Sequence, residues 1–267
     1  MELSVVVPTY NETLNIRPLC ERLFAAIKKE APAKFQLELL YVDDESAGTV
    51  KTIEIVNQLK KEGYNVGIIS RKKSEGRGLS SAVLLGFQKA KFSNILCMDA
   101  DLQHEPEAVY SVAKPVLQKK AEFSIGSRYC GGGGFGFDWA IHRRLISSVA
   151  TLLAFGVSKS TDPMSGFFCT RKDVLARRWD KINPIGFKIG LEIMARSNAN
   201  PVADVPITFQ SRIAGESKLT MKQNVQYIQQ LVSLYWDLKP LLVLCMIVSV
   251  LAILWIVYNS LIFPMSK

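Results

Sequence analysis

The sequence predicts an α/β protein whose mostly parallel sheet has helices on both faces, followed by interfacial helices and one C-terminal transmembrane helix. Two observations support this prediction. In the first half of the chain, apolar segments of strand length alternate with longer segments of helical periodicity. Near the end, residues 241–263 form an uncharged run of 23 residues. A helix of that length is long enough to cross a bilayer.

The strands are predicted where short runs of β-branched and other apolar residues are bounded by polar or turn-forming residues. They are expected at residues 5–7, 37–42, 66–70, 95–98 and 123–126. A helical segment separates each strand from the next, which is the connection that parallel strands need. We expect these crossovers to be right-handed.

The helices between these strands are predicted from apolar residues that recur every three or four positions. In the first helix, Leu19, Leu23 and Ile27 fall near one face. The four predicted helices are residues 13–30, 50–61, 79–91 and 107–119. Helices in these positions would cover both faces of a parallel sheet.

After residue 130 the regular alternation ends. Residues 131–136 are glycine-rich but lack the lysine of a phosphate-binding loop, so we expect a mobile loop there. Residues 141–157 follow as a helical pattern that contains Arg143 and Arg144. This pattern fits a lipid-facing amphipathic helix and a core helix equally well.

The C-terminal part has the pattern of a membrane-associated segment. Residues 220–238 place apolar side chains at helical spacing, which predicts a helix along the membrane surface, with a core helix as the alternative. In the uncharged run that follows, Trp255 and Tyr258 lie toward one end, as interface anchors often do. More basic residues precede the run than follow it, so the positive-inside rule places the large domain in the cytosol.

Composition narrows the class of protein. The formal net charge of +9 fits an anionic membrane surface or phosphate-bearing ligands. Basic residues do not cluster with aromatic ones, so no nucleic acid is expected as a partner. The five cysteines contain no C-x-x-C pair, which fits a reducing compartment. The first residues have a strand pattern rather than the features of a signal peptide.

Polar residues follow the predicted strands at the point where each strand ends. These are residues 8–12, 43–45, 99–103 and 127–128. The carboxyl ends of parallel strands meet at one edge of a sheet, and ligands of such proteins bind outside that edge. We therefore expect several carboxylates and Arg128 to gather on one rim.

Asp99 and Asp101 directly follow the fourth predicted strand, and Gln103 lies two residues further on. Two carboxylates at positions i and i+2 of an extended segment leave the same face of the chain. Carboxylate and amide oxygens are ligands that suit Mg²⁺ or Mn²⁺. The pattern predicts a metal site, with a turn that exposes solvated acids as the alternative.

Seven short motifs, in a fixed order between residues 3 and 238, resemble those of the family-2 glycosyltransferases. The motifs are Pro8-Thr9-Tyr10-Asn11-Glu12, Val42-Asp43-Asp44, Asp99-Ala100-Asp101-Leu102-Gln103-His104, Gly126-Ser127-Arg128-Tyr129, Asp162-Pro163-Met164-Ser165-Gly166-Phe167-Phe168, Gly186-Phe187-Lys188-Ile189-Gly190-Leu191-Glu192 and Gly215-Glu216-Ser217-Lys218-Leu219. The chain is most similar to single-chain members with one C-terminal membrane anchor. The resemblance implies a glycosyltransferase A-like fold and transfer of mannose from GDP-mannose to dolichyl phosphate.

The resemblance also implies a role for each matching residue. The guanosine part of the donor would be held by Pro8, Tyr10, Glu12, Val42 and Asp44. The ribose, diphosphate and metal would be approached by Asp99, Ala100 and Asp101. The metal set is Asp99, Asp101 and Gln103, with Asp101 and Gln103 as direct ligands of Mg²⁺ or Mn²⁺. The donor diphosphate and acceptor phosphate would be held by Arg128, Arg212 and Lys218, which with Asp101 form the predicted catalytic set.

The same resemblance implies a division of the chain into three parts and a cellular location. Residues 1–210 would be a cytosolic catalytic domain. Residues 211–239 would form the acceptor-phosphate loop and a membrane-interface helix, and residues 240–264 the transmembrane helix. The implied location is the endoplasmic reticulum membrane, as part of the glycosylation of proteins and the supply of glycosylphosphatidylinositol precursors, and partner subunits are not expected to be required.

The sequence departs from the family pattern at three places. Glu45 stands where glycine is usual, so we expect that turn to differ locally. Glu105 stands where proline is usual, and the glycine run has no counterpart. Arg178-Trp179 matches part of a motif of processive polysaccharide synthases, but Leu175 replaces its glutamine. With a single predicted span, this argues against a polymerase.

Two other functions stay open from sequence. One is a polyprenyl-phosphate glucosyltransferase that uses UDP-glucose. The other is a non-catalytic, membrane-anchored subunit that binds a nucleotide-sugar.

An acceptor phosphate is largely deprotonated at neutral pH, so the predicted reaction needs alignment and cations more than a general base. We expect a single displacement with inversion and a β-linked product.

Overall fold

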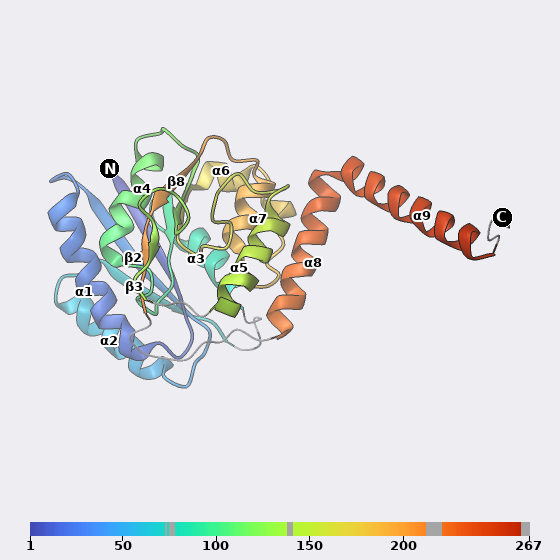
Figure 1. Cartoon of the computed structure of the whole chain (residues 1–267). Helices are drawn as coiled ribbons and strands as arrows, with labels where there is room; N and C mark the ends of the chain where they lie inside the picture. Colours follow the sequence, from blue (N-terminus) through green and yellow to red (C-terminus); the bar gives the residue numbers. More distant parts are fainter. Residues whose placement is uncertain (73, 75–77, 138–140, 212–220, 263–267) are drawn as a thin grey trace.

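The computed structural model describes residues 1–72, 74, 78–137, 141–211 and 221–262 of the 267-residue chain. For residues 141–145, 256, 257 and 259–262 the description covers the backbone alone. These residues form one α/β body from which a long C-terminal helix projects (Figure 1).

The body is built on a seven-stranded sheet with the strand order β3-β2-β1-β4-β7-β5-β8. Its strands are β1 (Glu2–Thr9), β2 (Gln36–Asp43), β3 (Val66–Ser70), β4 (Asn94–Cys97), β5 (Phe123–Ser127), β7 (Phe168–Arg171) and β8 (Val202–Pro206). β7 is antiparallel to both of its neighbours, and the other adjacent pairs are parallel. The prediction of a mostly parallel sheet is confirmed.

Both faces of the sheet are buried over its central strands, which are largely apolar on both sides. In β1, Val5 and Val7 belong to one core, and Val6 belongs to the other. The first core is covered by α1 (Thr13–Glu30), α2 (Thr49–Lys61) and α4 (Val109–Leu117), and the second by α3 (Leu79–Lys89) and α7 (Ile189–Arg196). The near-continuous apolar runs of these strands are typical of a sheet with helices on both faces.

The predicted strands and helices of the first half are all present, with ends that differ by a few residues. Beyond the glycine run, helices are present where residues 141–157, 220–238 and 240–264 predicted them, but sequence reasoning missed β7 and β8, which are short and lie where the chain pattern is irregular. It also missed α6 (Lys172–Ala176), α7 and the short 3₁₀ helices η2 (Pro106–Ala108) and η3 (Trp179–Lys181).

The glycine run contains a strand, where sequence alone predicted a loop. β6 (Gly134–Phe135) pairs in parallel with β9 (Thr208–Phe209). A Cβ atom on Gly133 would lie 2.5 Å from the carbonyl oxygen of Ser127, so the run needs a residue without a side chain there. The glycines thus allow the chain to pass close to the end of β5.

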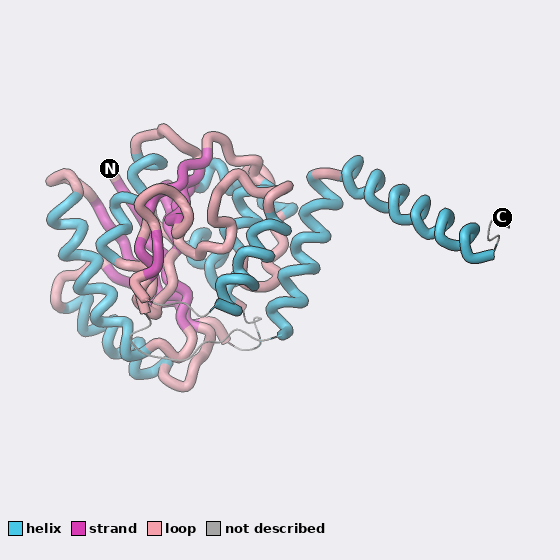
Figure 2. The backbone as a smooth tube through the Cα atoms, in the orientation of Figure 1, coloured by secondary structure: helices cyan, strands magenta, loops and turns pink. Residues whose placement is uncertain are grey.

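Two helices, α5 (Ile141–Ala154) and α8 (Met221–Leu238), lie side by side at the edge of the body (Figures 1 and 2). The hydroxyl of Tyr227 donates to the carbonyl of Ala150 at 2.6 Å, and that of Tyr235 donates to the carbonyl of Leu153 at 2.9 Å. α8 buries Tyr227, Leu231 and Leu234 and exposes its opposite face, whereas most described side chains of α5 are exposed or half-buried.

α8 meets α9 (Pro240–Ile262) at a sharp bend next to Lys239. Among the described residues, no single helix satisfies both the length and the apolarity required of a membrane span. α8 and the part of α9 up to Trp255 satisfy them only as a pair, bent by 109°.

Candidate active site

The parallel strands β1, β2, β4 and β5 bring the predicted site segments to one rim. Thr9 at the end of β1 is in register with Asp43 at the end of β2. The amide of Asp44 donates to the carbonyl of Thr9 at 3.2 Å, and the amide of Met98 donates to that of Val6 at 3.3 Å. The rim expected from the sequence is therefore present.

The two acids that follow β2 have different surroundings. Asp43 is buried and accepts hydrogen bonds from Thr9, Ser46 and Thr49, so it braces the turn. Asp44, the predicted guanosine-binding acid, is paired with the buried Arg71, whose Nε donates to its Oδ1 at 2.6 Å. Sequence reasoning missed Arg71, although it directly follows β3 and so stands on the same rim.

The turn after Asp44 is left-handed at Glu45. Glu45 has φ 46°, which is the left-handed conformation that glycine adopts without strain. A glutamate in this conformation carries a local cost of about 1 kcal/mol. Asn11 on the neighbouring loop is also left-handed, with φ 56°, and its Oδ1 accepts from the amide of Ala47 at 3.1 Å.

The remaining predicted nucleotide-site residues lie on the same edge. Tyr10 follows β1 with an exposed side chain, and Glu12 accepts from Nδ2 of Asn15 at 2.8 Å at the start of α1. Pro8 lies near the end of β1, where it is in register with the buried Val42 of β2.

The acidic motif forms a compact turn after β4. Oδ1 of Asp101 accepts from the amide of Gln103 at 3.1 Å, and Leu102 between them is left-handed, with φ 62°. Nε2 of Gln103 donates to the carbonyl of Gln210 at 3.0 Å. The amide group is thereby held through its nitrogen, and its oxygen is the atom suited to a cation. Ala100 is buried within the turn.

His104 supports this turn as a neutral side chain. Burial lowers the pKa of His104 to about 4, and its Nδ1 accepts from the amide of Asp99 at 3.3 Å. The ring packs on Phe167 and Phe209, with centroid distances of 5.1 and 5.3 Å. The contact between His104 and the Asp99 carboxylate, at 3.5 Å, is therefore not an ion pair at neutral pH.

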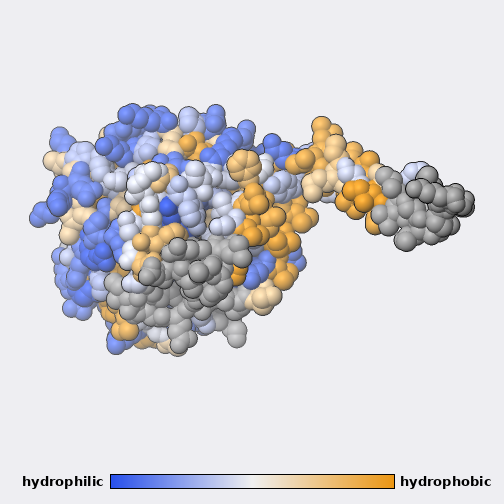
Figure 3. Space-filling view, in the orientation of Figure 1, coloured by the Kyte–Doolittle hydropathy of each residue, from blue (hydrophilic) through white to orange (hydrophobic). Residues whose placement is uncertain are grey.

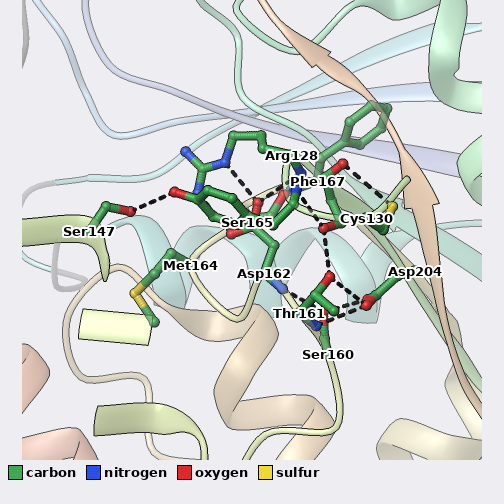
Figure 4. Close-up of polar contacts among 12 residues, drawn as sticks. Arg128, Cys130, Ser147, Ser160, Thr161, Asp162, Met164, Ser165, Phe167 and Asp204 are labelled. Carbon is green, nitrogen blue, oxygen red and sulfur yellow. Dashed lines mark hydrogen bonds and ion pairs between the residues drawn. The ribbon is translucent and has the colours of Figure 1, made fainter. Parts of the chain in front are cut away.

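Arg128 is held in a fixed orientation at the end of β5. Its Nε and one terminal nitrogen donate to the two oxygens of the fully buried Asp162 at 2.7 and 2.8 Å (Figure 4). The guanidinium carbon also lies 5.3–5.6 Å from the ring centroids of Tyr129, Phe135 and Phe209. A bidentate pair among aromatic rings keeps the cation rigid and partly desolvated.

Asp162 is itself positioned by its neighbours. The amide of Asp162 donates to Oγ of Ser160 at 3.0 Å, and that hydroxyl donates to Asp204 at 2.5 Å. Thr161 donates to Asp204 through both its amide and its hydroxyl (Figure 4). The segment before Asp162 is thus fixed to β8, and the orientation of Arg128 depends on it.

The loop of residues 162–166 connects Arg128 to two further groups of the rim. Nζ of Lys188 donates to the carbonyl of Met164 at 2.6 Å. A Cβ atom on Gly166 would lie 3.3 Å from both carboxylate oxygens of Asp99, so the loop passes directly against that acid. One loop therefore touches the predicted phosphate-binding arginine, a new lysine and the metal motif.

Lys188 is a site residue that sequence reasoning did not assign, although it lies in one of the family motifs. Burial and the nearby Arg128 guanidinium lower the pKa of Lys188 to about 8, while Asp99 and Asp162 oppose that shift. The lysine thus lies within electrostatic reach of both the arginine and the acids. It immediately precedes α7, which holds it in place.

α7 links this site to α8. Nε2 of Gln230 on α8 donates to the carbonyl of Lys188 and to Oε2 of Glu192, each at 3.1 Å. Nε of Arg196 donates to Oε1 of Glu192 at 2.5 Å, and Arg196 also contacts Asp237 and Ser233 of α8. Buried polar groups that satisfy one another in this way fix the relative position of two helices.

A divalent cation fits the acidic turn by the chemistry of its donors. Within the described parts of the chain, no three His, Cys, Asp or Glu side chains converge as a ready-made metal site. Asp99, Asp101 and Gln103 offer two carboxylates and one amide oxygen. Such a set suits Mg²⁺ or Mn²⁺ when phosphate oxygens of a substrate complete the coordination.

Two predicted site residues, Arg212 and Lys218, lie outside the described residues, within the segment 212–220. The side chains of Arg143 and Arg144 are also outside the description. The contacts of Arg212 and Lys218 with a phosphate therefore stay predictions.

Residues 4–179 match the model of the family described as Glycosyl transferase family 2. A dolichol-phosphate mannosyltransferase of Saccharomyces cerevisiae is 45% identical over 241 residues, which cover 88% of this chain and 87% of that protein. One of Mycosarcoma maydis is 42% identical over 256 residues, which cover 94% of this chain and 85% of its own length.

The fold is shared with solved structures of low identity. A mannosyltransferase of Pyrobaculum calidifontis, in complex with GDP-mannose and Mn²⁺, has a TM-score of 0.54 at 16% identity, covering 88% of this chain and 63% of its own. Mannosyl-3-phosphoglycerate synthase of Rubrobacter xylanophilus has a TM-score of 0.55 at 16% identity, covering 89% and 74%. These likenesses support the glycosyltransferase A-like α/β fold.

Proposed function

The chain belongs to glycosyl transferase family 2, and we propose that it transfers mannose from GDP-mannose to dolichyl phosphate, giving dolichyl β-D-mannosyl phosphate. The observation that carries this proposal is 45% identity over 241 residues with a relative that bears that name. The predicted donor-site acids, the acidic turn and Arg128 also share one rim of the sheet.

The nucleotide end of the donor would lie over β1 and β2. Asp44 is held by Arg71 and by the amide of Gly78, which donates to its Oδ2 at 2.9 Å. A carboxylate fixed in this way can accept hydrogen bonds from a base or ribose without rearranging. Tyr10 and Glu12 on the adjacent loop would complete that end.

The diphosphate would lie over the acidic turn, where Asp99, Asp101 and Gln103 would hold Mg²⁺ or Mn²⁺. Such an ion acts as a Lewis acid that stabilises the negative charge of the departing diphosphate. The chain's own contribution is orientation, since His104, Gly166 and Gln210 hold the turn in a fixed shape.

The reaction would be a single in-line displacement. An oxygen of the acceptor phosphate forms a bond to C1 of mannose while the bond from C1 to the GDP oxygen breaks, and GDP leaves as the anion. Arg128 and Lys188, together with Arg212 and Lys218, would offset the charge of two phosphates. A phosphate nucleophile needs no general base, so Asp101 is left to its role at the metal.

The membrane arrangement follows from exposed apolar side chains. On α5, on the residue directly after it and on α8 they form one apolar face, visible in Figure 3 between the body and α9, made of Ile146, Val149, Leu152, Leu153, Phe155, Val225, Ile228, Val232 and Trp236. With a 109° bend between α8 and α9, a bilayer crossed by α9 would lie along α8. We propose that α9 spans the membrane and that α5 and α8 rest on it.

The cellular location and the division of the chain belong to the same proposal. The catalytic domain would face the cytosol at the endoplasmic reticulum membrane, with no partner subunit required. Because α8 buries Tyr227, Leu231 and Leu234 in the core, the catalytic domain would include the inner face of the interface helix. The predicted boundary at residues 210–211 would then separate chain segments but not folding units.

The test is transfer of labelled sugar into organic-extractable lipid by the purified chain with dolichyl phosphate. GDP-mannose and UDP-glucose are compared, with and without a chelator. Chelator-sensitive labelling from GDP-mannose alone is expected. Labelling from UDP-glucose alone would replace the donor, and labelling from neither donor would contradict the proposed enzyme.

Asp101→Ala is expected to reduce turnover by at least about 10³-fold. The metal would lose a ligand, and the negative charge of the leaving diphosphate would lose the stabilisation that the metal supplies. The free energy of unfolding should change little beyond the loss of one turn hydrogen bond. Turnover and urea unfolding are measured on the same preparation. Preserved turnover in this variant would remove the metal role.

A further inference from the structure

A second basic feature lies away from the rim, at the C-terminal end of α8. A cavity of about 160 Å³ is lined there by Arg178, Lys181, Arg196, Asp237 and Leu238. These residues come from the η3 segment, the end of α7 and the end of α8. Three cations and one carboxylate therefore meet at a point two residues before α9 begins.

The charges of this cavity are not balanced among themselves. Arg196 is buried and contacts both Glu192 and Asp237, so its charge is matched and it forms a rigid wall. Arg178 and Lys181 are exposed, and their side chains have no ion pair with any residue in the described ranges. The cavity thus presents two cations to an incoming anion.

An apolar groove adjoins the cavity. It has a volume of about 380 Å³ and is lined by Ile228, Gln229, Val232, Ser233, Trp236 and Asp237 of α8. Asp237 lines both spaces, so the cationic cavity and the apolar groove lie next to each other along α8. A cationic end joined to an apolar track fits an amphiphile with an anionic head better than a free phosphate ion.

The cavity is separate from the reaction centre. Lys188 of the rim precedes α7, and Arg196 ends it. At a rise of 1.5 Å per residue, these positions are roughly 12 Å apart along the helix axis. The acceptor phosphate at the rim and an anion in this cavity would therefore be two different ligands.

We propose that this cavity and groove bind a bilayer phospholipid, with its anionic phosphate headgroup between Arg178 and Lys181 and an acyl chain along α8. This inference rests on the membrane insertion proposed above, which sets the cavity at headgroup level beside α9. Basic pockets at the cytosolic ends of membrane helices bind such headgroups. The bound lipid would hold the catalytic body in one orientation on the membrane.

The experiment uses the full chain in mixed micelles of a neutral detergent with increasing phosphatidate. Lipid retention and thermal stability are measured, and neither needs transferase activity. The test variant is Arg178→Gln with Lys181→Gln. The matched control is Lys28→Gln with Lys29→Gln, which removes the same charge from the exposed end of α1.

The half-saturating phosphatidate concentration should rise roughly 25-fold in the test variant, at about fivefold for each cation lost near a membrane surface. The control should stay within about twofold. An equal rise in both variants, or none in either, would overturn the site. A stability gain from inorganic phosphate equal to that from phosphatidate would overturn a lipid ligand.

Dolichyl phosphate serves as the last comparison. Its KM in the transfer assay should be unchanged in the test variant, because the cavity is distinct from the rim. A rise in that KM as large as the rise for phosphatidate would instead make the cavity part of the acceptor site and contradict the proposal.

Discussion

At the scale of single residues, the site depends on side chains that position others. Asp162 orients Arg128, Ser160 and Thr161 connect that segment to Asp204, and Gln210 holds Gln103. Lys188 donates a hydrogen bond to the backbone carbonyl of Met164, in the same loop as Asp162. A rigid surrounding of this kind matters because small misplacements of reacting groups cost large factors in rate.

Gly166→Ala tests the contact between the 162–166 loop and Asp99. The added methyl group would lie 3.3 Å from both carboxylate oxygens, tighter than ordinary contact, so the acid or the loop must shift. We expect kcat/KM to fall by about tenfold while the fold is kept. The control is Gly131→Ala, whose added Cβ would meet nothing within 4 Å. Equal activity of the two variants would contradict the positioning role.

At the scale of elements, α7 connects the rim to the membrane-facing helix. Its first turn follows Lys188, and its last residue, Arg196, contacts Ser233 and Asp237. Gln230 contacts the carbonyl of Lys188 from α8. A movement of α8 on the membrane would therefore directly change the position of Lys188.

Gln230→Ala removes this link from the α8 side. The carbonyl of Lys188 and the carboxylate of Glu192 each lose a donor in a buried setting. A loss of about 1–3 kcal/mol in the free energy of unfolding is expected, together with a higher KM for dolichyl phosphate. Gln229→Ala, on the exposed side of the same helix turn, should change stability by less than about 0.5 kcal/mol. Urea unfolding that fails to separate the two variants would contradict the link.

Glu122 bonds to Arg177 and to the backbone at Asn200, and its ionisation should make the stability of the protein depend on pH. It accepts two hydrogen bonds from Arg177 at 2.6 and 2.7 Å and one from the amide of Asn200 at 3.0 Å. The hydrogen bond from Arg177 lowers the pKa of Glu122 from 4.5 to about 2. The stabilisation is therefore present above the ordinary value and lost as pH falls through about 2.

Glu122→Gln should be less stable than the parent at pH 6, and the difference should shrink at pH 3. Urea unfolding at both pH values measures it. Glu54→Gln on the exposed face of α2 serves as the control and should show no such convergence. A parent–variant difference of the same size at both pH values would argue against the pairing.

At the scale of the whole molecule, the active rim and the apolar face of α5 and α8 belong to one body. Tyr227 and Tyr235 hold α5 against α8, and α7 packs against both α8 and α3, which covers the sheet. The membrane face and the rim are therefore held at a constant distance. A lipid acceptor that stays in the bilayer can reach the rim only if that face is docked.

Leu152→Glu places a charge on the apolar face, where the side chain is 72% exposed. Stability should change by less than about 0.5 kcal/mol, since no core contact is lost. Turnover should fall several-fold with dolichyl phosphate in vesicles but not with a short, water-soluble polyprenyl phosphate. Val50→Glu on α2, equally 72% exposed, is the control. Similar losses with both acceptors would exclude a membrane role for this face.

The sequence by itself determined the first half of the fold, the rim and the acidic motif. Strands such as residues 37–42 are apolar on both faces, and regular helical spacing lies between them, so local pattern and tertiary fold agree. The carboxyl ends of parallel strands all lie at one edge of such a sheet. Asp44, Asp99, Asp101 and Arg128 could thus be assigned to one edge from their positions alone.

Only the tertiary structure decided which polar groups meet. The residues that pair in the site are far apart in the sequence, and no sequence pattern predicts such pairs. They are Arg71 with Asp44, Arg128 with Asp162, and Lys188 with Met164. Glu45 is left-handed although it is not a glycine, a conformation that persists only where the surrounding structure holds it. The cavity of Arg178 and Lys181 has the same origin, since its walls come from three segments that only packing brings together.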